Sequence, residues 1–379
     1  MIKNLRFPQL LSLLQTVFAI RSDESCLTIF VDLPSAKLPD STAWQDRRTI
    51  AIEWYRELKS NISQTGFSCI RFCGYENVGS NNNDLPPTVH VIEDPNEAMQ
   101  ITELPSVQLD EVLKNSSIVL AMTELSATAP LKILARKYGF RGATLPGFSR
   151  EMIPSLALDY EKIHARVLQF KDRMDRATGI SVRFSANGKE YESYFDLRFR
   201  TGHASGGLIR EPGMMANLPS GEAYIVPYEG ERSGEPSKTA GLLPVQFSNE
   251  VVVYKLVENR AVSVTTGGEF SQREKTALIE EPAYGNIAEV GIGILGDWGV
   301  KAVGSTLLDE KLGLHIAFGR SEHFGGITSP ASFRDPGKVV HIDRVYVPSV
   351  QPLVTVQNAA FLYPTDASET IMKSGRYVV

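Results

Sequence analysis

The chain has 379 residues, of which 42% are hydrophobic and 22% are charged, and its formal net charge is -5. This length and composition are typical of a soluble globular protein with two domains and a substantial apolar core. The acidic balance leaves no basic excess to neutralise phosphates, so it excludes nucleic acid as the main partner.

The first predicted element is a helix near the N-terminus. Residues 10–20 (LLSLLQTVFAI) follow two cationic residues and superficially resemble an export signal. Gln15 interrupts this apolar run, however, and the large apolar residues fall on one helical face. We therefore expect an amphipathic helix packed on the core. No stretch approaches the roughly 18 apolar residues of a membrane span, so no membrane association is expected.

Strand-like and helix-like segments then alternate up to about residue 177. The predicted strands cover residues 26–33, 68–75, 88–94 and 116–125, and the turn after residue 139 leads into one more. The predicted helices cover residues 44–60, residues 130–139, which Gly139 ends, and residues 151–177. This alternation predicts an α/β domain over residues 1–177 with a mostly parallel sheet.

The pattern changes from residue 178 onward. Short runs of β-branched and aromatic residues, separated by turns, predict an antiparallel or mixed sheet. Helices are expected within this region over residues 273–281 and near residues 298–308. Residues 178–379 are thus predicted as a β-rich α+β domain, and the whole chain as an α/β protein of two domains.

Cysteine content bears on the cellular compartment. Cys26, Cys69 and Cys73 cannot all pair with one another. Free thiols are typical of proteins in a reducing compartment, so we expect three reduced cysteines and a cytoplasmic protein.

The residues with catalytic potential gather in the second domain. Carboxylates and imidazoles occur there in apolar, glycine-flanked segments: Glu222 in NLPSGE, Glu289 in GNIAEVGIG, His315 in GLHIAFG, and His341 with Asp343 in HID. Taken singly, each has a structural interpretation, such as a core histidine or a turn carboxylate. A buried carboxylate is nevertheless costly unless it is paired or bound to a metal. If the five converge, they can hold one divalent metal, or two bridged by a carboxylate.

Two family resemblances follow from these motifs. The segments NLPSGE, GNIAEVGIG, HIAFG and HID, in this order, resemble the thermophilic-type (aminopeptidase T-like) metallo-aminopeptidase family. The resemblance implies an N-terminal α/β domain, a two-metal site in the C-terminal domain, a homodimer, and removal of N-terminal residues from peptides. It assigns the metal ligands to Glu222, Glu289, His315, His341 and Asp343. The family's active-site tyrosine, seven residues after the first histidine, corresponds to Glu322 here.

The N-terminal half resembles a related branch more closely. Residues 123–160 are similar to the branch that includes the dihydroxypyridine ring-opening dioxygenases. That resemblance implies a single Fe(II) held by two histidines and one aspartate. The His-x-Asp pair of that branch corresponds to His341 and Asp343.

Three functional hypotheses result. The first is a metal-dependent hydrolase of the aminopeptidase type, using Zn, Co or Mn, in which Glu222, Glu289 or Glu322 takes a proton from the attacking water. The second is a mononuclear Fe(II) ring-cleaving dioxygenase with His315, His341 and Asp343 as its ligands. The third is a catalytically idle relative that binds a peptide. The expected partners are a peptide or small-molecule substrate and a second copy of the chain.

Overall fold

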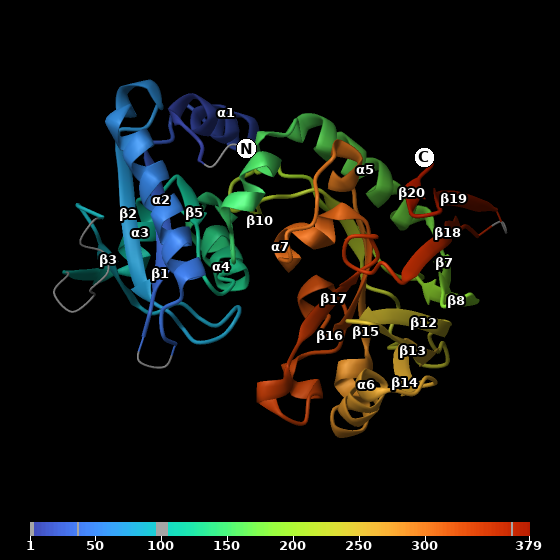
Figure 1. Ribbon diagram of the computed structural model, residues 1–379. Helices are drawn as coiled ribbons and strands as arrows, with labels where there is room; N and C mark the ends of the chain where they lie inside the picture. The colour runs from blue at the N-terminus through green and yellow to red at the C-terminus, as the bar shows by residue number, and fades with distance from the viewer. Residues whose placement is uncertain (1–3, 36–37, 96–104, 365–366) are drawn as a thin grey trace. The chain divides into compact units, whose positions relative to one another are not determined.

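The computed structural model describes residues 4–35, 38–95, 105–364 and 367–379. These residues form two compact units, drawn as ribbons in Figure 1. Unit 1 comprises Met1–His164 and Ser205–Ser220, and unit 2 comprises Ala165–Ala204 and Gly221–Val379. The predicted boundary after residue 177 follows helix α5 (Tyr160–Arg176), whereas unit 2 begins within that helix.

Unit 1 is built on a seven-stranded sheet in the order β10-β6-β5-β1-β2-β3-β4. Its strands are β1 (Cys26–Leu33), β2 (Cys69–Glu76), β3 (Thr88–Val91), β4 (Ser106–Gln108), β5 (Ile118–Ala121), β6 (Arg141–Thr144) and β10 (Met215–Asn217). The strands from β10 to β2 pair in parallel, and β3 and β4 complete one edge in antiparallel pairing. The mostly parallel sheet predicted for this half is therefore confirmed.

The helices of unit 1 follow the predicted apolar faces. They are α1 (Phe7–Phe18), α2 (Thr42–Ser60), α3 (Leu109–Lys114) and α4 (Thr128–Tyr138). Helix α1 buries the apolar face predicted near the N-terminus, and α2 lies along β1 and β2 (Figure 1). Helix α4 ends at Gly139, as predicted, with that residue in the left-handed conformation.

The long helix predicted over residues 151–177 is interrupted. A 3-10 segment, Arg150–Ala157, comes first, Leu158 is extended, and only then does α5 begin. Pro154 lies inside the 3-10 segment, and because proline has no amide hydrogen it cannot support a continuous α-helix there.

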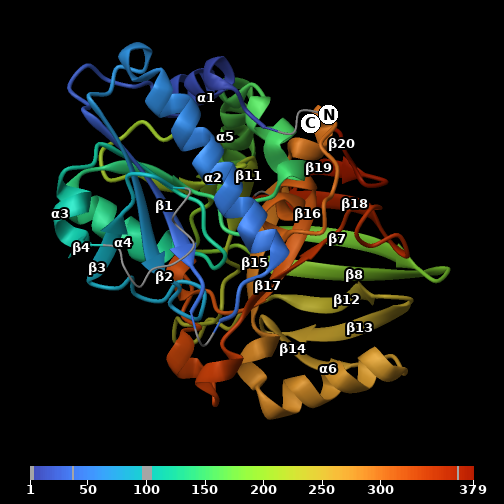
Figure 2. The same ribbon diagram turned by 60° about the vertical axis from the view of Figure 1, so that its left-hand side comes forward.

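The larger sheet of unit 2 has eight strands in the order β14-β13-β12-β8-β7-β18-β19-β20. They are β7 (Gly179–Ala186), β8 (Lys189–Asp196), β12 (Ala240–Phe247), β13 (Glu250–Val257), β14 (Arg260–Val264), β18 (Val354–Leu362), β19 (Ser368–Lys373) and β20 (Arg376–Tyr377). Neighbouring strands run antiparallel, as predicted for this half. Figure 2 shows α6 (Glu269–Glu280), the helix predicted at 273–281, against β14.

A smaller five-stranded sheet in unit 2 has the order β17-β16-β15-β11-β9. Its strands are β9 (His203–Ser205), β11 (Glu222–Ile225), β15 (Ile287–Gly293), β16 (Leu314–Gly319) and β17 (His341–Val345). The pairs β11–β15, β15–β16 and β16–β17 are antiparallel. Four of these strands, β11, β15, β16 and β17, carry the predicted metal ligands.

One predicted helix of unit 2 is much shorter than expected. Residues 298–308 hold only the end of a 3-10 turn (Leu295–Trp298) and most of the four-residue helix α7 (Thr306–Asp309). Gly299 and Gly304 adopt positive φ angles between them, and this backbone conformation does not continue a right-handed helix.

Other predictions concern the whole chain. The mixed helices and sheets confirm the α/β class. Cys26, Cys69 and Cys73 are free thiols. Among the helices in the described part of the chain, none combines the length and apolar character that crossing a membrane requires.

Candidate metal centre

One face of the five-stranded sheet carries all the predicted ligands. Across the antiparallel pairs, Glu222 lies opposite Gly293, Gly291 opposite His315, Ala317 opposite Asp343, and Gly319 opposite His341. Partners in such pairs share a face, as do residues two apart along a strand. This face therefore presents Glu222, Tyr224, Glu289, His315, His341 and Asp343. Between them it carries glycine or alanine, which leaves room for the larger side chains.

Three of these residues form a tight buried group. One ligand atom each from Glu222, Glu289 and His315 lies within 4.8 Å of the others. The Nε2 atom of His315 is 3.0 Å from Oε1 of Glu289 and 3.4 Å from Oε2 of Glu222. The three residues are 6%, 5% and 0% exposed, so the group is largely shielded from water.

Glu289 also reaches His341, a predicted ligand that lies beside Asp343. Its second oxygen, Oε2, is 3.5 Å from Nε2 of His341, and the same nitrogen is 3.8 Å from Oδ1 of Asp343. The two oxygens of one carboxylate thus face different histidines. We call Glu222 and His315 the inner half-site, and His341 and Asp343 the outer half-site, with Glu289 shared between them.

Backbone carbonyls orient both imidazoles. Nδ1 of His341 lies 2.7 Å from the carbonyl oxygen of Arg320, and Nδ1 of His315 lies 3.2 Å from that of Gly313. A carbonyl oxygen can only accept, so each Nδ1 must donate its hydrogen. Nε2 is then the atom left to face the carboxylates. This is the arrangement in which histidine binds metal ions.

A buried lysine balances part of the negative charge. Nζ of Lys311 is 2.6 Å from Oε1 of Glu222 and also contacts the carboxylate of Glu310. Burial alone would lower the pKa of Lys311, but the two carboxylates outweigh it and raise the pKa, so the ammonium stays charged. One cation faces several carboxylates, which leaves an excess of negative charge for a divalent ion.

The ionisable groups of the centre shift the pKa values of one another. Burial would raise the pKa of Glu289, but hydrogen bonds and charges from His315 and His341 lower it. Burial would likewise lower the pKa of both histidines, but the hydrogen bond with Glu289 and the surrounding carboxylates raise it, to about 10 for His315 and about 9 for His341. In the metal-free protein these protons supply the positive charge that the carboxylates require.

A divalent ion fits this centre. The Oε2 atom of Glu222 is buried and has no hydrogen-bond partner. An unsatisfied buried carboxylate oxygen is costly, and a cation beside it removes that cost. A side chain at Gly291 would fill the centre, because a Cβ atom there would lie 1.9 Å from Nε2 of His315. The donor set of carboxylates and imidazoles suits Zn, Mn, Co or Fe.

Glu322 lies at the edge of this region. Its carboxylate is held by Nε of Arg320 at 2.7 and 2.8 Å, and it lies 3.5 Å from Nδ1 of His323. Burial would raise the pKa of Glu322, but the pairing with Arg320 and His323 lowers it. Its link to the centre runs through the ring of His323, which lies 5.4 Å from that of His341. Its role in catalysis stays a prediction.

A chain of aromatic rings borders the centre. The ring of Phe324 lies 5.5 Å from that of His341 and 5.0 Å from that of Tyr224. The ring of His203 stacks on Tyr224 at 5.0 Å, with its Nε2 atom 2.9 Å from the carbonyl oxygen of Phe324. Burial and the carboxylates of Glu289 and Glu222 raise the pKa of Tyr224.

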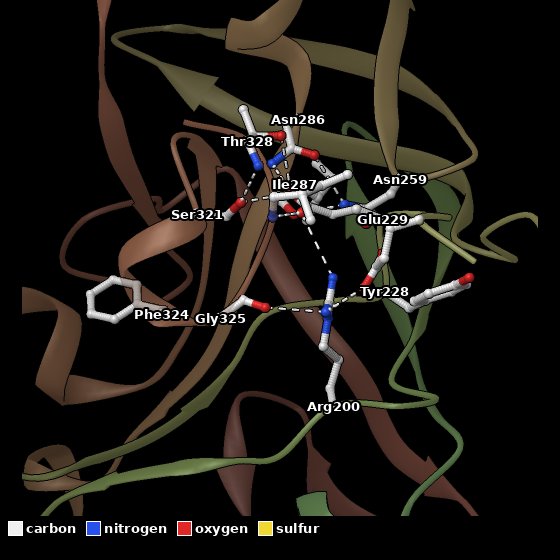
Figure 3. A network of polar contacts seen from close by, with 12 residues as sticks. Arg200, Tyr228, Glu229, Asn259, Asn286, Ile287, Ser321, Phe324, Gly325 and Thr328 are labelled. Atoms are coloured by element: carbon white, nitrogen blue, oxygen red, sulfur yellow. Dashed lines mark hydrogen bonds and ion pairs between the residues drawn. The ribbon is translucent and has the colours of Figure 1, made fainter. Parts of the chain in front are cut away.

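The loop that carries Phe324, residues 321–328, is held by a buried carboxylate. Glu229, whose side chain is 3% exposed, accepts from Asn286 Nδ2 at 2.6 Å, Ser321 Oγ at 2.7 Å and Thr328 Oγ1 at 3.1 Å, and from the amide of Ile327. Figure 3 shows this network, with Arg200 reaching Glu229 and the carbonyl of Gly325. The 321–328 loop is thereby tied to Asn286, which directly precedes β15.

The charged run Asp309–Lys311 stands just before His315, and this position indicates a supporting role for Lys311 at the centre. Tyr224, Glu229 and Arg200 are not predicted from the sequence, although Tyr224 lies two residues after Glu222 on a strand. Glu229 and Arg200 offered no such signal. Their partners on the 321–328 loop lie about a hundred residues or more away in the chain, so only the folded structure reveals these contacts.

Comparison with known proteins gives structural likeness only. No protein-family model matches the sequence, and no curated protein matches it. Among solved structures, the chain is similar to 2,5-dihydroxypyridine dioxygenase from Pseudomonas putida KT2440, with 13% identity, a TM-score of 0.60, and coverage of 99% of this chain and 98% of the other. It is also similar to wild-type AmpT from Thermus thermophilus, with 13% identity, a TM-score of 0.54, and coverage of 98% and 99%. The two likenesses show a shared fold.

Proposed function

We propose that this protein is a metal-dependent hydrolase of the aminopeptidase type, which binds two divalent ions and cleaves the first amide bond of a peptide. The observation that carries the proposal is the position of Glu289 between the two half-sites. A carboxylate whose oxygens face different ligand groups is suited to bridging two metal ions. The fold likeness to AmpT is consistent with this proposal.

Each half-site contributes its own ligands. Glu222 and His315 would hold one ion, His341 and Asp343 the other, and Glu289 both. Bound divalent ions at this position would polarise the substrate carbonyl and lower the pKa of the attacking water.

A carboxylate of the centre must take the proton of the water and return it to the leaving amine. Of the three glutamates predicted for this role, Glu222 keeps one oxygen without a hydrogen-bond partner, Oε2, which is also the oxygen that it offers to a metal ion. Glu289 is engaged by both imidazoles, and Glu322 is engaged by Arg320.

A mononuclear iron dioxygenase is the second candidate, with His315, His341 and Asp343 as its ligands. The orientation of both Nε2 atoms toward the centre supports it, as does the fold likeness to 2,5-dihydroxypyridine dioxygenase. The two carboxylates of the centre besides Asp343 (Glu222 and Glu289) favour the hydrolase, because a two-histidine, one-carboxylate iron site does not need them.

Metal counting and a substrate test separate the candidates. The chelated protein is reloaded with Mn, Co, Zn or Fe(II), its metal content is measured, and aminoacyl chromogenic substrates are added. We expect two equivalents and hydrolysis with at least one of the first three metals. One iron per chain with no hydrolysis would support the dioxygenase, and no bound metal would leave a peptide-binding relative.

A matched pair of variants tests the shared carboxylate. Glu289→Gln keeps the shape of the side chain and removes its charge, so we expect loss of at least one metal equivalent and a fall in turnover of more than about a hundredfold. Glu190→Gln removes an exposed carboxylate from β8 of the same unit and should change neither quantity. Two equivalents retained in Glu289→Gln would contradict the bridging role.

A further inference from the structure

Tyr224 lies on the ligand-bearing face of the five-stranded sheet. It follows Glu222 by two residues on β11, so both side chains leave the strand on the same side. Opposite Tyr224 in the register is Gly291, and beyond Gly291 lies His315. Because Gly291 has no side chain, nothing on β15 at that position separates the tyrosine from the histidine.

The hydroxyl of Tyr224 differs from those of most other tyrosines in unit 2. A hydrogen bond to an acceptor within the chain is donated by the hydroxyl groups of Tyr194, Tyr228, Tyr254, Tyr284, Tyr346 and Tyr377. Among the described residues, none accepts from or donates to the hydroxyl of Tyr224. Tyr224 is half-buried, and because its hydroxyl has no partner within the described part of the chain, it is available beside the candidate centre to a partner from outside the chain.

Neighbouring rings fix the position of this hydroxyl. The imidazole of His203 stacks on the Tyr224 ring with an interplanar angle of 22°, and Phe324 packs edge-on against it at 67°. The carbonyl of Phe324 in turn holds the ring of His203. The phenol is therefore positioned before a substrate arrives, which is the property that makes a donor effective in catalysis.

We propose that Tyr224 is a catalytic residue of the proposed hydrolase, whose hydroxyl donates a hydrogen bond to the substrate carbonyl oxygen as negative charge develops on it. This inference rests on the proposed function. The proton stays on Tyr224 throughout, since an ordinary phenol has a pKa of about 10, so the residue forms and breaks no covalent bond. Its contribution is electrostatic and grows as the carbonyl carbon becomes tetrahedral.

The test is Tyr224→Phe, which removes one oxygen atom and leaves the ring packing in place. We expect kcat to fall roughly a hundredfold, because removing one oxyanion donor typically costs this much, while KM and the metal content stay unchanged. The matched control is Tyr191→Phe on β8 of the same unit, which should keep the wild-type kcat. Equal melting temperatures for both variants would show that the fold is intact.

A second measurement needs no turnover. A phosphinic dipeptide analogue imitates the tetrahedral carbon and its oxygens, so calorimetry should show it binding Tyr224→Phe at least tenfold more weakly than wild type. The amine released from the substrate, which carries no oxygen of the scissile carbonyl, should bind both proteins equally.

The possible failures are distinguishable. If wild type hydrolyses the substrates and Tyr224→Phe keeps full kcat and full analogue affinity, the role of Tyr224 is wrong and the proposed function stands. If wild type neither hydrolyses any aminoacyl substrate nor binds the analogue with any of the metals, the proposed function is wrong and the role of Tyr224 falls with it.

Discussion

At the scale of single residues, the charge of the centre predicts opposite pH dependences for the metal-free and metal-bound protein. The pKa values of His315 and His341 are raised to about 10 and about 9, above the value of about 6.5 expected in an unfolded chain. Their protonation stabilises the metal-free fold fully below pH 6.5, and this contribution is lost as the pH rises through 9 and 10. Metal binding needs the unprotonated imidazoles, so metal affinity rises over the same interval.

Thermal unfolding between pH 6.5 and 9 checks this prediction. With a chelator present, the melting temperature should fall as the pH rises. With saturating Mn or Zn, the added stabilisation should grow with pH, and the difference between the two curves should widen. A constant difference across the range would contradict the idea that the metal and the protons compete for the same two nitrogens.

Gly291 illustrates how little space separates the ligands. A Cβ atom at this position would lie 1.9 Å from Nε2 of His315, so Gly291→Ala must displace the imidazole from Glu289. We expect metal affinity to fall by at least about tenfold, as it does when the support of a ligand is disturbed. The control is Gly267→Ala, because a Cβ atom there meets nothing within 4 Å. Isothermal titration with metal compares the two, and equal affinities would refute the close packing of the centre.

At the scale of elements, the 321–328 loop depends on Glu229. The variant Glu229→Gln replaces a charged acceptor of several hydrogen bonds with a neutral amide whose nitrogen cannot accept. A hydrogen bond to a charged group contributes about 1.5–3 kcal/mol, so we expect a loss of about 2 kcal/mol in the free energy of unfolding. The loop should also become easier to cleave by proteases, since it is no longer tied to Asn286.

Urea unfolding and limited proteolysis measure these effects. The control is Glu231→Gln, since Glu231 pairs with Arg200 but donates nothing to the loop and accepts nothing from it among the described residues. Both variants remove one charge near Arg200, so only the loop contacts distinguish them. Equal stability and equal cleavage in the two variants would show that the loop is held by other contacts.

The elements differ in how well the sequence predicted them. Helix α2 and strand β1 have long, regular apolar patterns, and both were predicted within a few residues. The helix expected over residues 151–177 is interrupted, because Pro154 cannot donate the backbone hydrogen bond of an α-helix. The pattern of apolar residues alone does not reveal this interruption. The ligands could be named from their apolar surroundings, but their common face depends on the register of four strands, which the sequence does not specify.

At the scale of the whole molecule, the family resemblance predicts a homodimer. Light scattering at micromolar concentration should then report about twice the chain mass of 41.8 kDa. Repeating the measurement after chelation would show whether assembly depends on the metal. A mass of one chain in both conditions would remove this expectation.

The division into two units predicts where a metal ion acts. Every candidate ligand belongs to unit 2, on strands β11, β15, β16 and β17, and none belongs to the parallel sheet of unit 1. A bound ion stabilises the states in which its ligands are in place, so it suppresses local opening of the strands that carry them. Hydrogen exchange with and without Mn should therefore show slower exchange in those four strands.

The same experiment contains its own control in unit 1. Amides of β1, β2 and β5 should exchange at the same rate in both conditions, because no candidate ligand lies on them. Slower exchange confined to the four strands would locate the ion at the proposed centre without any assay of activity. Slower exchange in the parallel sheet alone would place the ion outside the proposed centre. That result would refute both the bridging role of Glu289 and the proposed hydrolysis.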